Sequence, residues 1–233
     1  MGGRGSFSMT HGGVATSSGG AGSFYISSSV ETRSDIRKMF IDELGFKELY
    51  GTNALSTAQL GALGIQPKKL ERQYGTISDG KTYLSVINKP GVLGAAMQTK
   101  DGSKVMFINP SAHENIGAYK KTLSDSQKSG FKTKTDGKVT SQYSYTVRHE
   151  YGHLTQYNLI NGATGNAANV SAARMRTEIR NIAKSKYGAS SDSPSRYGAT
   201  NRLEFFAESF ASMTGGNPNA YGKAMRDWFK KRK

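Results

Sequence analysis

Two histidines, His149 and His153, stand four positions apart in the segment RHEYGHLTQY, and Glu150 follows the first of them. Residues four apart on an α-helix lie on one face, about one turn from each other. Their imidazole nitrogens can therefore bind a single Zn²⁺ ion at about 2.0–2.1 Å. Glu150 is close enough to take a proton from water at such an ion without binding the ion itself. The spacing predicts a zinc-dependent hydrolytic site with Glu150 as the general base.

The alternative is a surface helix that carries two unrelated histidines, because so short a motif also occurs by chance. The chain has only four histidines, and half of them fall in this motif; the other two are His11 and His113. His113, in NPSAHENIG, is interpreted as a loop histidine and left out of the metal set. Gly152 within the helix costs about 1 kcal/mol relative to Ala, which indicates that another element packs closely there. These observations favour the metal site.

A further ligand is expected from residues 195–213, SRYGATNRLEFFAESFASM. Its large apolar residues have helical spacing: Phe205, Phe206, Phe210 and Met213. Glu204 and Glu208 lie four apart, so both can point to the same place, whereas the alternative is that one or both face solvent. A catalytic zinc site takes three protein ligands and leaves a fourth position for water. Either glutamate can fill the missing place.

The two motifs together, HEYGH and YGATNRLEFFAESFASM, resemble the catalytic domain of anthrax toxin lethal factor and its relatives, a gluzincin family of metallopeptidases. The resemblance covers about residues 144–213 and nothing convincing before Lys104. It implies that Glu204 is the third zinc ligand and that Tyr197 stabilises the tetrahedral intermediate or protonates the leaving amine. It also implies that Glu208 accepts a hydrogen bond that orients a zinc-bound histidine. Toxin action is not implied, because the delivery domains have no counterpart in this length.

The expected function is therefore a zinc-dependent metalloendopeptidase, with Zn²⁺ as cofactor and a polypeptide as substrate. The alternative is a structural or interaction protein, such as a phage virion component, that uses a zincin fold with little or no proteolysis. The opening MGGRGS is similar to leaders of phage head-associated and mobile-element proteins, which makes phage structural proteins candidate partners.

Composition limits the class of protein. The formal net charge is +15, from 32 Lys+Arg and 17 Asp+Glu, and it favours nonspecific contact with polyanions such as nucleic acid. No nucleic-acid motif accompanies the basic stretches, which lie at 120–138, 174–186 and 223–233.

The absence of Cys excludes disulfides and a thiolate metal site. No apolar run approaches the roughly 18–20 residues that span a bilayer. No secretory signal is seen either, so we expect no membrane partner and a location in the host cytoplasm or in a virion.

The fold class expected is α+β, a zincin-like domain with a small antiparallel or mixed sheet. Residues 1–30 are Gly/Ser-rich and predict a disordered leader, or an arm that orders against a neighbouring subunit. Residues 31–75 are expected to be helical, as a small lobe or as the roof of a catalytic domain over 76–233.

Periodicity predicts the individual elements. The N-terminal helices are expected at 34–49, 56–63, with Gly64 as the stop, and 67–74. Strands are expected at 82–87, 92–98 and 104–109, with a hairpin at Asp101-Gly102. A polar surface loop follows at 117–141. The last helices are expected at 144–159, 167–186 and 220–231, besides the one that carries Glu204. The final helix is expected to dock through Trp228.

Overall fold

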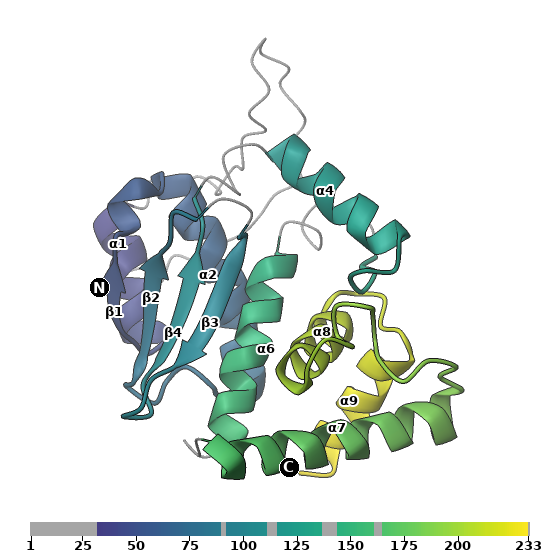
Figure 1. Cartoon of the computed structure of the whole chain (residues 1–233). Coiled ribbons are helices and arrows are strands. Elements are labelled where there is room, and N and C mark those ends of the chain that lie inside the picture. The colour runs from purple at the N-terminus through teal and green to yellow at the C-terminus, as the bar shows by residue number, and fades with distance from the viewer. Residues whose placement is uncertain (1–31, 90–91, 111–115, 137–143, 161–164, 233) are drawn as a thin grey trace.

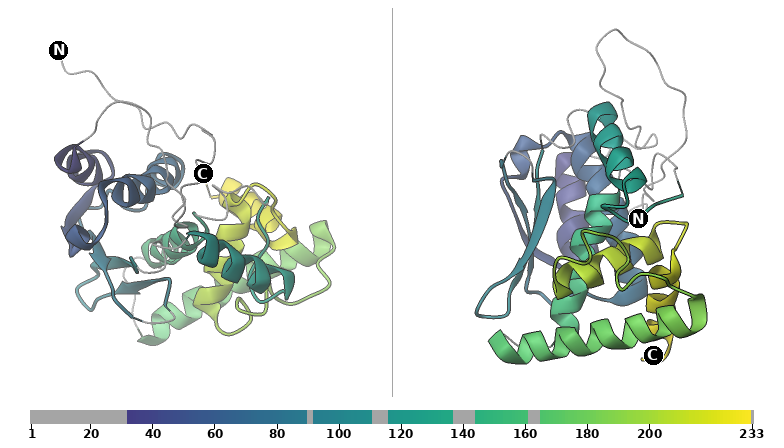
Figure 2. Two further views of the ribbon diagram at one scale, coloured as in Figure 1. Left: turned by 90° about the horizontal axis from the view of Figure 1, so that it is seen from above. Right: turned by 45° about the vertical axis from the view of Figure 1, so that its right-hand side comes forward.

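The computed structural model describes residues 32–89, 92–110, 116–136, 144–160 and 165–232. Within these residues the chain is α+β, as expected, with seven α-helices and one mixed sheet of four strands. Helix α6 (Tyr145–Leu159) lies at the centre, between the sheet and the C-terminal helices (Figures 1 and 2). Those helices are α7 (Gly165–Tyr187), α8 (Arg202–Thr214) and α9 (Ala220–Lys230). The arm predicted over 1–30 and His113 lie outside the described residues.

The sheet has the strand order β1-β2-β4-β3. Its strands are β1 (Phe46–Tyr50), β2 (Thr82–Val86), β3 (Gly94–Gln98) and β4 (Lys104–Ile108). The first two and β4 run parallel, whereas β3 pairs antiparallel with β4 and forms the edge next to α6 (Figure 1). The predicted turn between β3 and β4 is confirmed, with Gly102 at φ +81°. The three strands expected from residue 82 onward are confirmed to within two residues.

The helix expected over 34–49 is shorter, and its last residues form a strand instead. Helix α1 (Arg33–Lys38) continues as a π-helical turn, Met39–Glu43, and the chain then reverses at Gly45, with φ +75°. A Cβ at Gly45 would lie 2.4 Å from Cα of Ser78, so only glycine fits there. Phe46 and Leu49 are both buried, and this spacing of three residues is typical of a helix. In β1 a register shift between Phe46 and Glu48 breaks the regular alternation of the strand and accommodates it. Pairing with β2 in the sheet stabilises this segment as a strand.

One continuous helix, α2 (Thr57–Tyr74), replaces the two helices expected at 56–63 and 67–74. Gly64 does not stop it. A Cβ at Gly64 would lie 2.3 Å from Cε of Met39, so this glycine lets α2 approach the preceding π-helical turn. Pro67 lies inside the helix. The buried apolar residues of α2 and β1 belong to the same core as those of α6, α8 and α9. Residues 32–75 therefore share both sheet and core with the rest.

The loop expected over 117–141 is wrong in its first half, where helix α4 (Ile116–Lys128) forms. Leu123 is buried in this helix and packs against Tyr145 and Ala211. The polar, lysine-rich composition of 117–141 indicated a loop, although Ile116, Tyr119 and Leu123 have helical spacing. The helices expected at 144–159, 167–186 and 220–231 are confirmed to within two residues, and Trp228 is buried as predicted. None of the described helices combines the length and hydrophobicity needed to cross a bilayer.

Candidate metal centre

Helix α6 carries the histidine pair into the interior. His149, Glu150 and His153 are all buried, because β3 and β4 cover one side of the helix and α8 another. The close packing predicted at Gly152 is confirmed: a Cβ there would lie 3.0 Å from both Cα of Ala207 and Cβ of Phe210. This glycine therefore allows α8 to approach α6 and brings the α8 glutamates within reach of the histidines.

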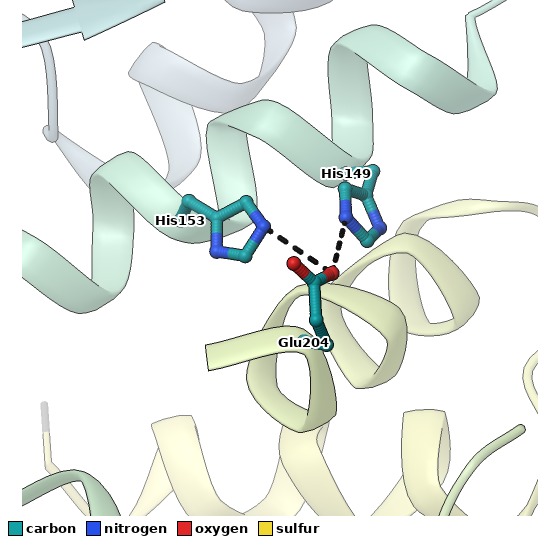
Figure 3. A group of neighbouring side chains, drawn as sticks. All are labelled: His149, His153 and Glu204. Carbon is teal, nitrogen blue, oxygen red and sulfur yellow. Dashed lines mark hydrogen bonds and ion pairs between the residues drawn. The ribbon is translucent and has the colours of Figure 1, made fainter. Parts of the chain in front are cut away.

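The two imidazoles converge on one carboxylate (Figure 3). Nε2 of His149 lies 2.9 Å from Oε2 of Glu204, and Nε2 of His153 lies 3.5 Å from the same oxygen. One candidate ligand atom from each residue lies within 4.8 Å of the others. Ligands bound about 2.0–2.2 Å from a tetrahedral ion stand roughly 3.4 Å apart, so the donor atoms present fit a metal ion. The cluster can bind a metal, and Glu204 is the glutamate that faces both rings.

The start of α8 explains the position of Glu204. Asn201 caps this helix, and its side-chain oxygen accepts hydrogen bonds from the backbone N–H groups of Leu203 and Glu204, each at 2.9 Å. Glu204 is thus held in the first helical turn. The nearby histidines outweigh partial burial and hold the pKa of Glu204 well below its usual range. Its carboxylate is therefore ionised and available as a ligand.

Glu208, one turn later, is fully buried and lies behind His149 rather than among the ligand atoms. Its Oε1 lies 3.1 Å from Nδ1 of His149 and accepts a hydrogen bond from the Tyr145 hydroxyl. Its Oε2 accepts hydrogen bonds from the backbone N–H of Thr133 at 2.8 Å and from the Ser195 hydroxyl at 2.7 Å. Glu208 therefore joins two loops to α6 at the ring of His149.

The two carboxylates also set the charge of His149. Burial by itself lowers the pKa of this imidazole, but its contacts with Glu204 and Glu208 raise the pKa to about 9. For Glu208 the effects are opposite: burial raises the pKa of this carboxyl group, whereas His149, Tyr145 and Ser195 lower it to about 2. In the metal-free protein at neutral pH, His149 is therefore a cation between two anions. Binding of a metal ion through this ring requires the loss of that proton.

Glu150 lies beside the edge strand, where a Cβ on Gly94 would be 3.2 Å from its Cγ. Burial raises the pKa of Glu150, and the neighbouring histidine charges only partly offset this. A carboxyl group with a raised pKa is suited to accept and return a proton near neutral pH.

Tyr197 lies in the turn before α8, and its backbone N–H donates to the carbonyl of Phe131 at 2.8 Å. Its ring stacks on that of His149, with the centroids 5.7 Å apart. Burial and the charges of Glu204 and Glu150 raise the pKa of Tyr197, so the phenol keeps its proton. The structure thus brings together all six residues singled out in the sequence: His149, His153, Glu204, Glu208, Glu150 and Tyr197.

Two further residues at the site were not predicted. Tyr157 stacks on His153, with ring centroids 6.4 Å apart, and the spacing of 149, 153 and 157 by four residues would have indicated it. Lys132 lies with its Nζ 5.1 Å from the ring centroid of Tyr197 and 5.3 Å from that of Tyr145. Nothing in the sequence around Lys132 distinguishes it from its lysine-rich neighbours.

Comparison of the chain with protein-family models, with curated proteins and with solved structures gives no match. The resemblance to gluzincins therefore rests on the two sequence motifs. The His-His-Glu cluster is a separate, geometric observation.

Proposed function

We propose that this protein is a zinc-dependent metalloendopeptidase of the gluzincin type. The observation that carries the proposal is the convergence of His149, His153 and Glu204 at the centre of the molecule, with Glu150 buried beside them. Two imidazoles and one carboxylate are the donor set of zinc sites in several peptidases. The sequence contains no thiol that would make a softer site.

Each residue has a role in this proposal. A zinc ion held by His149, His153 and Glu204 would lower the pKa of water and polarise the carbonyl of the scissile peptide bond. Glu150 accepts the proton from water and passes it to the leaving nitrogen. Tyr197, which stays protonated, donates a hydrogen bond to the carbonyl oxygen as negative charge develops on it. Glu208 keeps the ring of His149 in place from its other nitrogen.

The edge strand β3 is the proposed binding element for the polypeptide. It pairs with β4 along one side, and Gly94 near its start approaches Glu150. Outside the sheet, the described contact with its backbone is the hydrogen bond from the Tyr157 hydroxyl to the carbonyl of Ala96, at 3.3 Å. An extended peptide can add to such an edge through main-chain hydrogen bonds. The carbonyl of its scissile bond would then lie next to Glu150.

The test is cleavage of a denatured protein library by the zinc-loaded protein, with and without a chelator. Replacing Glu150 by Gln should leave the zinc content unchanged and reduce the rate by at least about 100-fold, since a general base contributes that much or more. Replacing His149 by Ala should remove the metal, as measured by elemental analysis. Full activity of the Glu150 variant would show that this residue is not the base.

A binding role for polyanions is the second candidate function, favoured by the net charge of +15. Part of the basic surface on α7, on α9 and just after α9 is neutralised by ion pairs, among them Lys186–Asp227 and Arg232–Glu178. The proposal of a nucleic-acid-contacting protein predicts retention of DNA that weakens steeply with salt, without proteolysis. Chelator-sensitive cleavage together with no DNA retention would exclude it.

A further inference from the structure

A pocket of about 730 Å³ opens next to the metal centre. It lies between the end of β3, the last turn of α6, the first half of α7 and the start of α8. Two of its lining residues adjoin the site: Leu203 precedes Glu204, and Tyr157 stacks on His153. Neither histidine nor Glu204 lines the pocket itself. The pocket is therefore a neighbouring space that opens beside the proposed catalytic residues.

The walls of this pocket are mostly apolar, but its charged residues are all cationic. Met97, Tyr157, Ile160 and Leu203 supply large apolar groups, and the charged lining residues are Arg176 and Arg202. Among the lining residues that the structure describes there is no carboxylate. A pocket of this composition suits a group with an apolar stem and a negative end.

Both arginines are held in place by neutral groups. The Arg202 guanidinium donates to the carbonyl of Asn169 at 3.2 Å, and that of Arg176 lies 5.3 Å from the ring centroid of Phe205. Across the described ranges neither arginine forms an ion pair. Asp192, which also attracts Arg176, pairs with Lys184 at 2.5 Å. The two guanidiniums are thus positioned while most of their hydrogen-bonding capacity for a planar anion remains available.

The partial positive charge at the start of α8 adds to that of the arginines. Thr200, Asn201 and Arg202 belong to the pocket wall, so the helix begins at the pocket. The helix dipole favours negative charge at this end. The two arginines supply most of the positive potential in this pocket, because Asn201 already accepts hydrogen bonds from the N–H groups of Leu203 and Glu204 at the helix start.

The edge strand links the pocket with the catalytic glutamate. Gly94 approaches Glu150, and Met97 and Gln98 further along β3 line the pocket. Extended chains advance about 3.3 Å per residue, so a peptide paired with β3 reaches the pocket about three or four residues from the bond at Glu150. We infer that the pocket selects polypeptides with an Asp or Glu side chain at that distance on one side of the cleaved bond. The inference rests on the proposed function and deepens it.

Cleavage profiling provides the first test. Wild-type protein loaded with zinc should cut a denatured protein library with Asp and Glu enriched at one position within about four residues of the scissile bond. For matched, C-terminally amidated peptides with Glu or Gln at that position, kcat/KM should favour Glu by about 10-fold or more, because hydrogen bonds to a charged group are strong. In the double variant Arg176→Gln, Arg202→Gln this ratio should fall towards one. Arg180→Gln, one turn along α7 and outside the pocket, removes a charge as well and should keep the ratio.

A binding measurement separates failure of this inference from failure of the proposed function. Amidated peptide pools that differ only in one Glu or Gln are titrated against the Glu150→Gln variant, with fluorescence anisotropy as the readout. A preference for the Glu pool that disappears when both arginines are replaced supports the inference about the pocket. It does so even if the wild-type protein cleaves nothing and the hydrolase proposal is wrong. Efficient cleavage without an acidic preference leaves the hydrolase proposal standing and overturns the pocket inference. Equal binding of the two pools also overturns it.

Discussion

Two carboxylates that contact α6 from different helices, Glu71 on α2 and Glu208 on α8, are built on the same plan. Glu71 accepts hydrogen bonds from the Tyr151 hydroxyl at 2.6 Å and from the backbone N–H groups of Thr76, Ile77 and Ser78. Glu208 accepts from the Tyr145 hydroxyl, the Thr133 backbone and the Ser195 hydroxyl. In each case one acidic residue ties a loop to a tyrosine of the central helix. Figure 1 shows the two supporting helices on different sides of α6.

The difference lies in what else each carboxylate reaches. Glu208 lies 3.1 Å from Nδ1 of His149, a proposed metal ligand, whereas Glu71 contacts, among the described residues, a tyrosine and one loop. Both groups have a lowered pKa. A perturbed pKa therefore does not by itself distinguish a functional carboxylate from a structural one. Contact with a candidate ligand does.

The largest expected contrast is in metal affinity. Replacing Glu208 by Gln should weaken zinc binding about 10–100-fold, the usual effect of losing the group that orients a ligand. Replacing Glu71 by Gln is the matched control and should change the affinity little. Competition with a chromophoric chelator at neutral pH measures both constants. Equal losses in the two variants would remove the distinction drawn between the two carboxylates.

Tyr151 and Tyr145, which donate hydrogen bonds to Glu71 and Glu208, test the same contrast between a structural and a functional carboxylate. Tyr151→Phe removes a hydrogen bond to the Glu71 carboxylate and should lower the free energy of unfolding by about 1.5–3 kcal/mol, without an effect on zinc affinity. Tyr145→Phe should lower both the free energy of unfolding and the zinc affinity, because Glu208 without this hydrogen bond holds His149 less firmly. Chemical denaturation of the metal-free proteins, followed by the chelator titration, gives the two readouts. A loss of zinc affinity in Tyr151→Phe alone would contradict the assignment.

Acid titration sharpens the structural half of the comparison. Burial raises the pKa of Glu71, but hydrogen bonds from Ser78, Tyr151 and Ile77 outweigh it, so the folded pKa lies below the ordinary value. Its stabilisation is therefore fully present above an unfolded pKa of about 4.3 and is lost as the pH falls through the folded value. The difference in unfolding free energy between metal-free wild type and Glu71→Gln should shrink on acidification from neutral pH. A difference that grows on acidification would have the wrong sign.

The smallest effects are expected at two helix glycines. At Gly152 an added methyl meets the α8 backbone at Ala207, which must move, whereas at Gly64 its nearest neighbour is the flexible end of Met39. Gly152→Ala should cost about 1 kcal/mol net, because overpacking exceeds the gain in helix propensity, and it should weaken zinc binding. Gly64→Ala should leave zinc binding unchanged and alter stability by less than about 1 kcal/mol. Thermal unfolding and the chelator titration measure both, and weaker zinc binding in Gly64→Ala would contradict the link between Gly152 and the site.

Local patterns in the sequence were sufficient for much of the framework. The common face of His149 and His153, the strand pair around Asp101-Gly102 and the spacing of Glu204 and Glu208 all depend on neighbours within about one helical turn or one hairpin. Helix α4 was missed because the polar, lysine-rich composition of 117–141 indicated a loop and outweighed the helical spacing of Ile116, Tyr119 and Leu123. The strand β1 was missed because the spacing of Phe46 and Leu49 is that of a helix, and β1 accommodates it only through a register shift between Phe46 and Glu48.

Spacing alone left open which glutamate faces the histidines, since Glu204 and Glu208 differ by a single turn. The packing of α8 against Gly152 decides it, by placing Glu204 at both Nε2 atoms and Glu208 behind His149. Lys132, Arg176 and Arg202 likewise acquire their positions only from contacts between distant segments. Residue types and their periodicity along the chain therefore determined which groups could do chemistry. Tertiary packing determined which of them meet, because contacts between remote segments leave no periodic trace in the sequence.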